Sequence, residues 1–230
     1  MSASSEGQLY GYAGKLLRVD VSNEKVKVDA PDPEMLRAYI GGIGVGAKTL
    51  YDELPAGIDP LGPENKLIFT TGPLTGTEAP GSGFVEVCFK SPLTGVWGES
   101  KCGSDWGGNL RKAGFDFLVV EGKARTPRYI VINDGEVEIR PAEKLQGKTT
   151  REKTKLVLEE LKDDRYKVAV IGPAGEKLVR FANIMIEDRA AGRCGAGAVM
   201  ASKNLLAIAV KGNGKIPVAN PREFSGRLRQ

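Results

Sequence analysis

Few residues in this chain could carry out chemistry directly, and two of them recur in similar surroundings. Histidine is absent, which removes the commonest acid–base group near neutral pH and the commonest metal ligand. Cys102 and Cys194 each precede a glycine in a glycine-rich stretch. Their matching places suggest a shared role, although small residues also fit tight loops for steric reasons alone. Cys88 lies in an alternating apolar run and is predicted to be a buried core thiol.

The composition excludes several classes of protein. The three cysteines include no CxxC pair and no set of four, so this chain alone is not expected to ligate an iron–sulfur cluster or structural zinc. Their odd number and the lack of a signal peptide favour a reducing cytoplasm. The net charge of +4 is dispersed, which does not indicate nucleic acid as a partner. No stretch approaches the ~20 apolar residues that span a membrane.

The two Cys-Gly pairs belong to a pattern that the chain uses twice, at about 66–123 and 167–212. Each copy begins with an apolar strand, reaches Gly-Pro, passes Cys-Gly and a lysine (Lys112 or Lys203), and closes in a second apolar run. Two matched glycine-rich loops would form a pseudo-symmetric cradle for a paired ligand. The alternative is an old duplication with no ligand at its axis, because repeats are often purely architectural.

The elements that must position these loops are mostly strands. Apolar or alternating runs predict strands over 14–21, 25–29, 67–71, 84–89, 117–120, 129–133, 136–140, 168–171, 178–184 and 206–210. Capping signals and periodicity predict helices that start at Asp32, Asp105 and Thr149, and further helices over 47–54 and 198–203. The irregular order of helices and strands predicts an α+β fold, internally duplicated, with mostly antiparallel or mixed sheets.

Three regions are predicted to lie outside these elements. The run at 42–46 follows a helix rather than a strand, so it is not a dinucleotide-binding loop. The stretches 101–104 and 189–197 are predicted to be loops. Residues 1–10 are expected to be a disordered lead-in, 11–212 one domain, and 213–230 a linker toward a missing C-terminal region, with a new element starting near 221.

Several long motifs resemble one known family. They are Gly11–Asp20, Pro60–Phe69, Thr71–Thr77, Lys90–Gly95, Lys112–Asp116, Val119–Ala124, Ile171–Glu176, Arg189–Arg193, Gly197–Met200 and Ser202–Leu205. In this order, and without large gaps from about residue 11 to 218, they resemble the N-terminal domain of the aldehyde ferredoxin oxidoreductase family.

The resemblance implies a fold and an activity. Family members oxidise aldehydes to carboxylic acids and pass the electrons to ferredoxin. They use tungsten or molybdenum held by two pterins (tungstopterin), beside a [4Fe-4S] cluster. Their N-terminal domain is a pair of related sheets, with short helices, that forms a base under the two pterins. The cluster cysteines lie in later domains, so this chain is expected to be inactive alone. Its expected partners are C-terminal domains of the same polypeptide, ferredoxin or another redox subunit, and possibly a second copy.

The resemblance also implies site residues, none of them catalytic. Lys101 and Ala190 match positions whose backbone carbonyls bind a magnesium ion that bridges the two pterin phosphates. A main-chain ligand tolerates the lysine, although its ammonium could compete with the metal. Gly103 and Arg189 match pterin-contacting positions, and Gly192 lies on the same loop. The alternative role for Arg189 is a surface or structural ion pair.

Two departures from the family pattern stand out. Phe84 and Ile43 occupy positions where relatives usually carry arginine, and phenylalanine cannot donate a hydrogen bond. The coupling between pterin and cluster is therefore in doubt, and a divergent paralogue with another substrate or altered electron transfer is one interpretation. A non-enzymatic stand-alone pterin-binding or assembly subunit is the alternative function.

Overall fold

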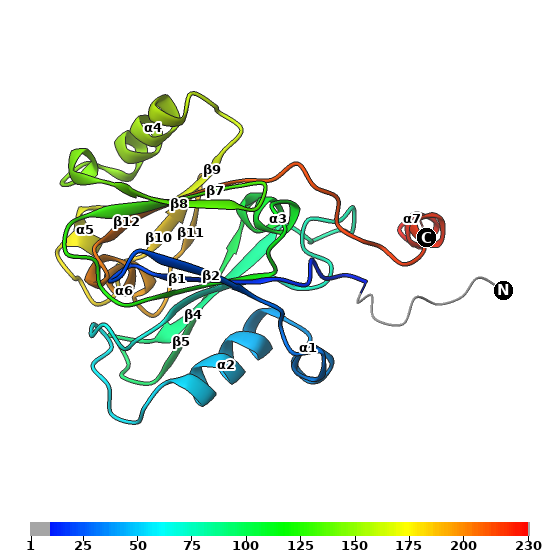
Figure 1. The fold of residues 1–230 in the computed structure, drawn as a ribbon, viewed down its shortest axis with the longest axis horizontal. Helices are drawn as coiled ribbons and strands as arrows, with labels where there is room; N and C mark the ends of the chain where they lie inside the picture. The colour runs from blue at the N-terminus through cyan, green and yellow to red at the C-terminus, as the bar shows by residue number, and fades with distance from the viewer. Residues whose placement is uncertain (1–9, 230) are drawn as a thin grey trace.

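The computed structural model describes residues 10–229 and confirms the α+β class (Figure 1). The strands of the first half are β1 (Leu16–Asp20), β2 (Lys25–Asp29), β3 (Leu67–Thr70), β4 (Phe84–Lys90), β5 (Trp97–Gly103) and β6 (Phe117–Glu121). Those of the second half are β7 (Arg128–Asn133), β8 (Glu136–Pro141), β9 (Lys167–Ile171), β10 (Ile184–Ile186), β11 (Arg189–Ala191) and β12 (Leu205–Lys211). The helices are α1 (Pro33–Tyr39), α2 (Gly42–Glu53), α3 (Trp106–Lys112), the 3-10 turn η1 (Glu143–Leu145), α4 (Thr150–Leu161), α5 (Pro173–Glu176), α6 (Ala196–Ser202) and α7 (Pro221–Arg227).

The two halves form six-stranded sheets with the same strand order. The first sheet runs β2-β1-β6-β3-β4-β5, and the second runs β8-β7-β12-β9-β10-β11 when it is read from the equivalent edge. In each sheet one central pair is parallel, β1 with β6 and β7 with β12, and the other pairs are antiparallel. The correspondence therefore includes the first hairpin of each half. It extends beyond the repeats at 66–123 and 167–212 to the strands of 16–121 and 128–211.

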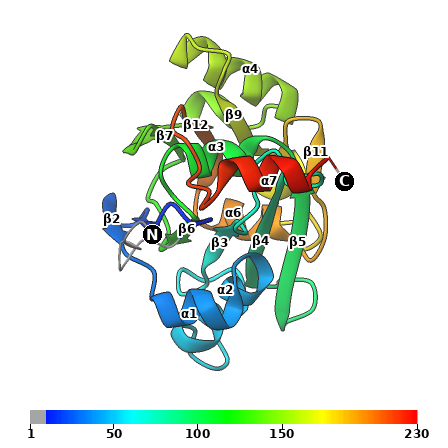
Figure 2. The same ribbon diagram turned by 90° about the vertical axis from the view of Figure 1, so that its right-hand side faces the viewer.

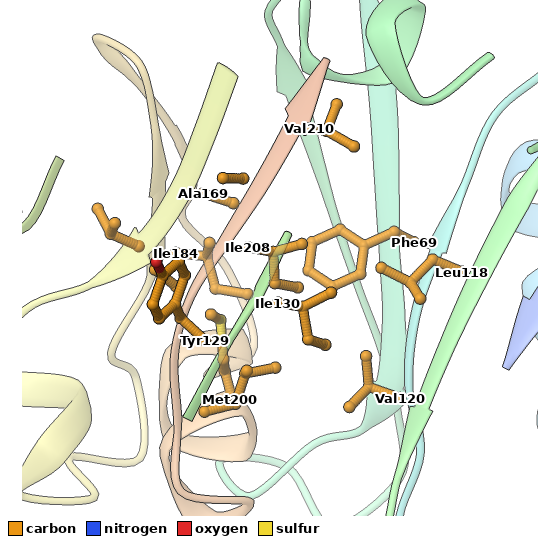
Figure 3. Close-up of a cluster of buried hydrophobic side chains, with 14 of the residues drawn as sticks. Phe69, Leu118, Val120, Tyr129, Ile130, Ala169, Ile184, Met200, Ile208 and Val210 are labelled. Atoms are coloured by element: carbon orange, nitrogen blue, oxygen red, sulfur yellow. The ribbon is translucent and has the colours of Figure 1, made fainter. Parts of the chain in front are cut away.

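The main core lies between the two sheets. Figure 3 shows Phe69 and Leu118 of the first sheet facing Ile130 and Ile208 of the second, and all four are fully buried. Helices α3 and α6 lie between the sheets and contact both of them. Trp106 of α3 is fully buried, and its indole N–H donates to the carbonyl of Ile208 at 3.2 Å.

The outer faces of the sheets are covered by other helices. Helix α2 packs on β3 and β4, and α4 packs on β9, so the two helices occupy equivalent outer positions (Figures 1 and 2). Helix α2 approaches β4 closely, because a Cβ on Gly46 would lie 2.5 Å from the sulfur of Cys88. Helix α7, predicted as the start of a new element, has no buried residue. No helix in residues 10–229 has the length and apolarity needed to cross a membrane.

Local sequence signals account for several elements. The Asp32 carboxylate accepts from the N–H of Glu34 at the start of α1, and Thr149 with Glu152 forms a reciprocal capping box at α4. The Asp134-Gly135 turn joins β7 to β8, with both residues at positive φ. Asp105, in contrast, precedes α3 but its side chain makes no capping hydrogen bond.

Four local predictions were wrong. Helix α2 begins at Gly42, five residues before the predicted start at residue 47, and its Gly46 packs closely on β4. The predicted strand at 178–184 is mostly turns, since Leu178 has a φ of 54° and only Ile184 belongs to a strand. Residues 97–103 and 189–191 form strands β5 and β11. The predicted loops at 101–104 and 189–197 therefore include the end of one strand and the whole of another. Residues 1–9, most of the predicted lead-in, lie outside the described residues.

A buried ion pair ties the N-terminal segment to the first sheet. Arg111 Nε lies 3.0 Å from Asp116 Oδ1, and both side chains are almost completely buried. The Arg111 guanidinium donates to the carbonyls of Gly72 and Gly11, whereas Asp116 accepts from the N–H groups of Ala13 and Gly14. These contacts fix the segment before β1 against the turn that follows β3.

Removing one partner of this pair should destabilise the fold. Asp116→Ala leaves a buried guanidinium without its counter-charge, a change that costs about 3–5 kcal/mol of unfolding free energy. Urea unfolding followed by circular dichroism measures the loss. Glu159→Ala is the control, because it breaks only the exposed pair with Lys155 and should change stability by no more than about 0.5 kcal/mol. Equal stability of the two variants would contradict the assigned role.

Candidate functional site

The predicted site residues lie where the two sheets meet at their edges. Strands β5 and β11 are the last strands of their sheets, and they contact each other (Figure 2). The N–H of Arg193 donates to Ser100 Oγ at 3.0 Å, and Ser91 Oγ donates to the carbonyl of Cys194 at 2.7 Å. The segments 101–104 and 189–193 therefore lie side by side. We call this contact between β5 and β11 the seam.

The strand registers identify which residues are equivalent in the two halves. Lys101 of β5 pairs with Glu86 of β4, and Ala190 of β11 pairs with Met185 of β10. Glu86 and Met185 each lie opposite the residue two positions before the Gly-Pro pair of their own half. Lys101 and Ala190 are therefore equivalent, and so are Glu86 and Met185.

The same register corrects the equivalence expected for the cysteines. Cys102 pairs with Val85, and Ala191 pairs with Ile184, so Cys102 is equivalent to Ala191. Cys194 follows β11 in the turn before α6 and has no counterpart in β5. The similarity of the two Cys-Gly pairs does not reflect equivalent positions in the fold.

The thiol of Cys102 is poorly suited to chemistry. Its side chain is buried in the seam, and burial raises the pKa of Cys102 to about 11. The Glu187 carboxylate contributes to this raised pKa to a smaller extent than burial, and the Arg189 guanidinium opposes both effects. Burial also raises the pKa of the Cys88 thiol, which lies in the core beneath α2 as predicted.

The lysines that seemed matched in the repeat also differ. Lys203 is fully buried, and its ammonium donates to the carbonyls of Asn65 and Gly122. Burial lowers the pKa of Lys203 to about 8. Lys112 is exposed, and in its helix the neighbouring Arg111 is the buried cation. Both buried cations hold backbone carbonyls and are structural.

The Lys101 ammonium is held by its own strand neighbours. Its Nζ lies 3.7 Å from Oε1 of Glu86 and 4.2 Å from the centre of the Phe84 ring. The side chain is engaged on the outer face of the sheet, which leaves the main chain of Lys101 as the group available for a ligand. This arrangement removes the competition between the ammonium and a metal that the sequence suggested.

Arg189 and Gly192 are available for a ligand, whereas Gly103 has a neighbour in the chain. Arg189 is exposed and forms no salt bridge within residues 10–229, because nearby Glu187 pairs with Lys167. A Cβ on Gly192 would meet nothing closer than 3.8 Å, so the packing of the chain does not require glycine there. A Cβ on Gly103 would lie 3.1 Å from the Phe84 ring.

The donor chemistry of the seam suits phosphate and magnesium better than a metal held by side chains. One side of each edge strand has no strand partner, so its carbonyls can face a ligand. Carbonyl oxygens are ligands that magnesium accepts, and arginine suits phosphate. Residues 10–229 contain no group of three or more His, Cys, Asp or Glu side chains placed to hold a metal.

Two hollows lie near these strands. A hollow of about 590 Å³ between α4 and the second sheet is lined by Met185, Glu187 and Asp188, and so ends beside Arg189. A more apolar hollow of about 520 Å³ is lined by Tyr51 of α2, by Trp97 and by other residues. It lies at the opposite end of β5 from Lys101 and Gly103, so it is separate from the seam. Trp97 is 37% exposed.

Comparison with known sequences decides the family. The model of the aldehyde ferredoxin oxidoreductase N-terminal domain matches residues 16–212. The chain belongs to the aldehyde ferredoxin oxidoreductase family. It is 47% identical, over 223 residues, to the tungsten-containing aldehyde ferredoxin oxidoreductase of Pyrococcus horikoshii, covering 96% of this chain and 37% of that protein.

Two further relatives of this domain carry different names. The aliphatic sulfonate oxidoreductase, WOR-like subunit, of Pyrococcus furiosus is 40% identical over 232 residues, covering 94% of this chain and 37% of that protein. A chain of the active-site complex BamBC of benzoyl coenzyme A reductase, solved with 1,5-dienoyl-CoA, superposes with a TM-score of 0.94. It is 39% identical, and the match covers 96% of this chain and 34% of that one. The chain thus spans little more than a third of these relatives.

The structure also brings out residues that the sequence did not single out. Glu86 is 7% exposed and lies on the outer face of β4 beside Lys101. Burial raises the pKa of Glu86, while Lys101 lowers it and Glu99 raises it. The one sequence signal was an acidic residue between two valines in an otherwise apolar strand.

The three thiols should differ in reactivity. Iodoacetamide at about pH 8 should alkylate half-buried Cys194 before Cys88 and Cys102, because the latter are buried and the thiolate is the reactive form. Peptide mass spectrometry at successive times measures the order. Labelling in guanidinium chloride is the control, where all three should react. Cys102 reacting as fast as Cys194 in the folded chain would show that the seam is open.

Proposed function

We propose that this chain is the cofactor-cradling domain of a tungsten or molybdenum bis-pterin oxidoreductase. The observation that supports the proposal most directly is the equivalence of Lys101 and Ala190 on two adjoining edge strands. A pseudo-symmetric pair of backbone positions suits a ligand with two similar halves, such as two pterin phosphates bridged by magnesium.

Each site residue then has a defined task. The carbonyls of Lys101 and Ala190 bind the magnesium ion, and the Arg189 guanidinium neutralises phosphate charge. Gly103 and Gly192 keep side chains out of the space that the cofactor approaches. When bound, the metal–pterin group supplies two-electron redox chemistry. The chain itself binds and orients that group.

The proposed reaction is the oxidation of aldehydes to carboxylic acids, with ferredoxin as electron acceptor. Its support is the name shared by the 45–47% identical relatives. The relatives named for sulfonate and benzoyl coenzyme A chemistry show that this domain also occurs with other substrates. The substrate is therefore proposed to be selected by later domains, which would also carry the [4Fe-4S] cluster. Alone, the chain is proposed to be inactive, and its proposed location is the cytoplasm.

Arg189→Ala tests the proposed contact with phosphate. A charge-assisted hydrogen bond is worth about 1.5–3 kcal/mol, so cofactor affinity should fall about ten- to a hundred-fold. The holoenzyme variant should lose most of its tungsten or molybdenum, as measured by inductively coupled plasma mass spectrometry. Its melting temperature should be unchanged, because Arg189 is exposed and forms no salt bridge within the described residues.

Arg125→Ala is the matched control, since Arg125 is an exposed arginine outside the seam. It should retain full metal content. Full metal content in Arg189→Ala together with a lowered melting temperature would assign Arg189 a structural role and contradict the proposal.

A further inference from the structure

Hydrogen bonds cross the seam before, within and after β5. The contacts of Ser91 and Ser100, described above, lie before and within the strand. After β5, the N–H of Asp105 donates to Oε2 of Glu187 at 3.1 Å. This last contact lies at the end of β5 that carries Lys101, next to the residues with proposed roles in the cofactor site.

Glu187 lies in the turn between β10 and β11. Ile186 pairs with Arg189, so Glu187 and Asp188 are the two turn residues. Glu187 has a φ of 54°, in the left-handed region where glycine is accommodated at lower cost than other residues. The backbone of the turn therefore favours glycine, and a reason for glutamate has to come from its side chain.

Both carboxylate oxygens of Glu187 have partners, and the partners belong to different halves. Oε1 accepts from the Lys167 ammonium at 2.8 Å, at the start of β9 in the second sheet. Oε2 accepts from the N–H of Asp105, directly before α3 in the first half. The carboxylate therefore links the β10–β11 turn to both halves.

The contact with Asp105 replaces a cap that α3 does not supply itself. Asp105 stands at the N-cap position, but its side chain makes no capping hydrogen bond. In a capping box, a glutamate at the third helical position would accept from the N–H of the N-cap residue. That position in α3 is Gly108, where a Cβ would lie 3.2 Å from Cα of Gly76. Glu187 provides the acceptor from the other half.

Helix α3 is a firm anchor for this turn. Strands β10 and β11 have three residues each, and β11 pairs on one side only. A short hairpin is only weakly stable by itself. Helix α3, in contrast, lies between the sheets, and its Trp106 is fully buried. The link from Glu187 to the start of α3 therefore fixes the edge strand that carries Arg189 and Ala190.

The contacts of Glu187 also keep it from neutralising Arg189. Glu187 and Arg189 both affect the pKa of the Cys102 thiol, which places the two charges at one end of the seam. The Glu187 carboxylate is nevertheless paired with Lys167, and Arg189 forms no salt bridge within residues 10–229. The Arg189 guanidinium is therefore left available for an anionic ligand.

We propose that Glu187 is a positioning residue for the cofactor site. It holds the β10–β11 turn against the end of β5, and thereby sets the distance between the carbonyls of Lys101 and Ala190 and the direction of the Arg189 guanidinium. This inference rests on the proposed function. Glu187 acts through these three residues and does not touch the cofactor itself.

Two substitutions of Glu187 test the link across the seam in the 230-residue chain. Glu187→Ala and Glu187→Gln both remove the charge near Cys102, but glutamine keeps an oxygen that can accept from the N–H of Asp105. Iodoacetamide should therefore label Cys102 about two- to tenfold faster in Glu187→Ala than in Glu187→Gln, the effect of losing one hydrogen bond. Peptide mass spectrometry at successive times measures both rates.

Cys88 is the internal control for this labelling. It is buried in the core of the same sheet, beneath α2 and away from the seam. Its rate should be the same in both variants, because a local opening at the seam leaves it covered. A general loss of stability would speed the labelling of Cys88 and Cys102 together.

The metal content of the holoenzyme tests the consequence for the cofactor. Loss of an outer residue that orients metal ligands commonly lowers metal affinity about ten- to a hundred-fold. Glu187→Ala should therefore lose most of its tungsten or molybdenum, as measured by inductively coupled plasma mass spectrometry, and Glu187→Gln should retain most of it. Glu138→Ala is the matched control, because it breaks an exposed pair with Arg140 on β8, the opposite edge strand of the second sheet. It should keep full metal content.

Three results would overturn the inference. One is equal labelling of Cys102 in the two Glu187 variants. Another is faster labelling of Cys88 by the same factor as Cys102 in Glu187→Ala, which would indicate general destabilisation. The third is full metal content in Glu187→Ala.

Failure of the proposed function would be a separate result. Full metal in Arg189→Ala contradicts the phosphate contact, whereas the labelling ratio of Cys102 involves no cofactor. A loss of metal in Glu187→Ala but not in Arg189→Ala would overturn the phosphate contact and support Glu187 as the positioning residue for the two carbonyls.

Discussion

The shared core between the two sheets is the constraint on which the rest of the structure depends. Each sheet has an apolar inner face, and burying both faces together, with α3 and α6 between them, brings the edge strands β5 and β11 into contact. The contact tolerates little bulk. A Cβ on Gly98 would lie 2.9 Å from the Cβ of Ser91 and 3.1 Å from that of Cys194. Small residues along β5 therefore follow from the packing of the core, and the seam is a consequence of that packing.

A site made by two adjoining backbones depends weakly on side-chain identity. Lys101 and Ala190 have very different side chains but equivalent strand registers, and a carbonyl ligand requires only the register. This explains how a lysine is compatible with the proposed cation site, given that Glu86 and Phe84 hold its ammonium away. The side chains at the ends of these strands can therefore differ between the two halves without moving the backbone carbonyls. The differently named relatives of this domain fit a base of this kind, whose geometry comes from the main chain.

The sequence predicted the parts of the fold that carry their own local signals. The capping box at Thr149, the Asp134-Gly135 turn and the alternating runs were enough to place most strands and helices. Strand β5 was missed because its buried positions are Gly98, Ser100 and Cys102, which give no hydrophobic alternation. The family motifs indicated Lys101, Ala190 and Arg189. Which residues of the two halves are equivalent became clear only from the strand register, and this register showed that Cys102 and Cys194 are not equivalent. The link between Glu187 and Asp105 joins residues 82 positions apart, so no local sequence pattern could have revealed it.

Duplication and divergence act on different levels of this domain. The strand order and register are repeated because both halves must present the same apolar face to one core, and a slip of one residue would turn that face outward. Positions on the outer faces carry no such requirement. Glu86 and Met185 occupy equivalent places there, one closed beneath Lys101 and the other lining an open hollow. The Glu86 carboxylate has one buried oxygen that accepts no hydrogen bond from any described residue, which is costly to the folded chain. Its presence at one of two equivalent positions shows that the outer faces of the two halves have diverged, whereas their strand order and register have not.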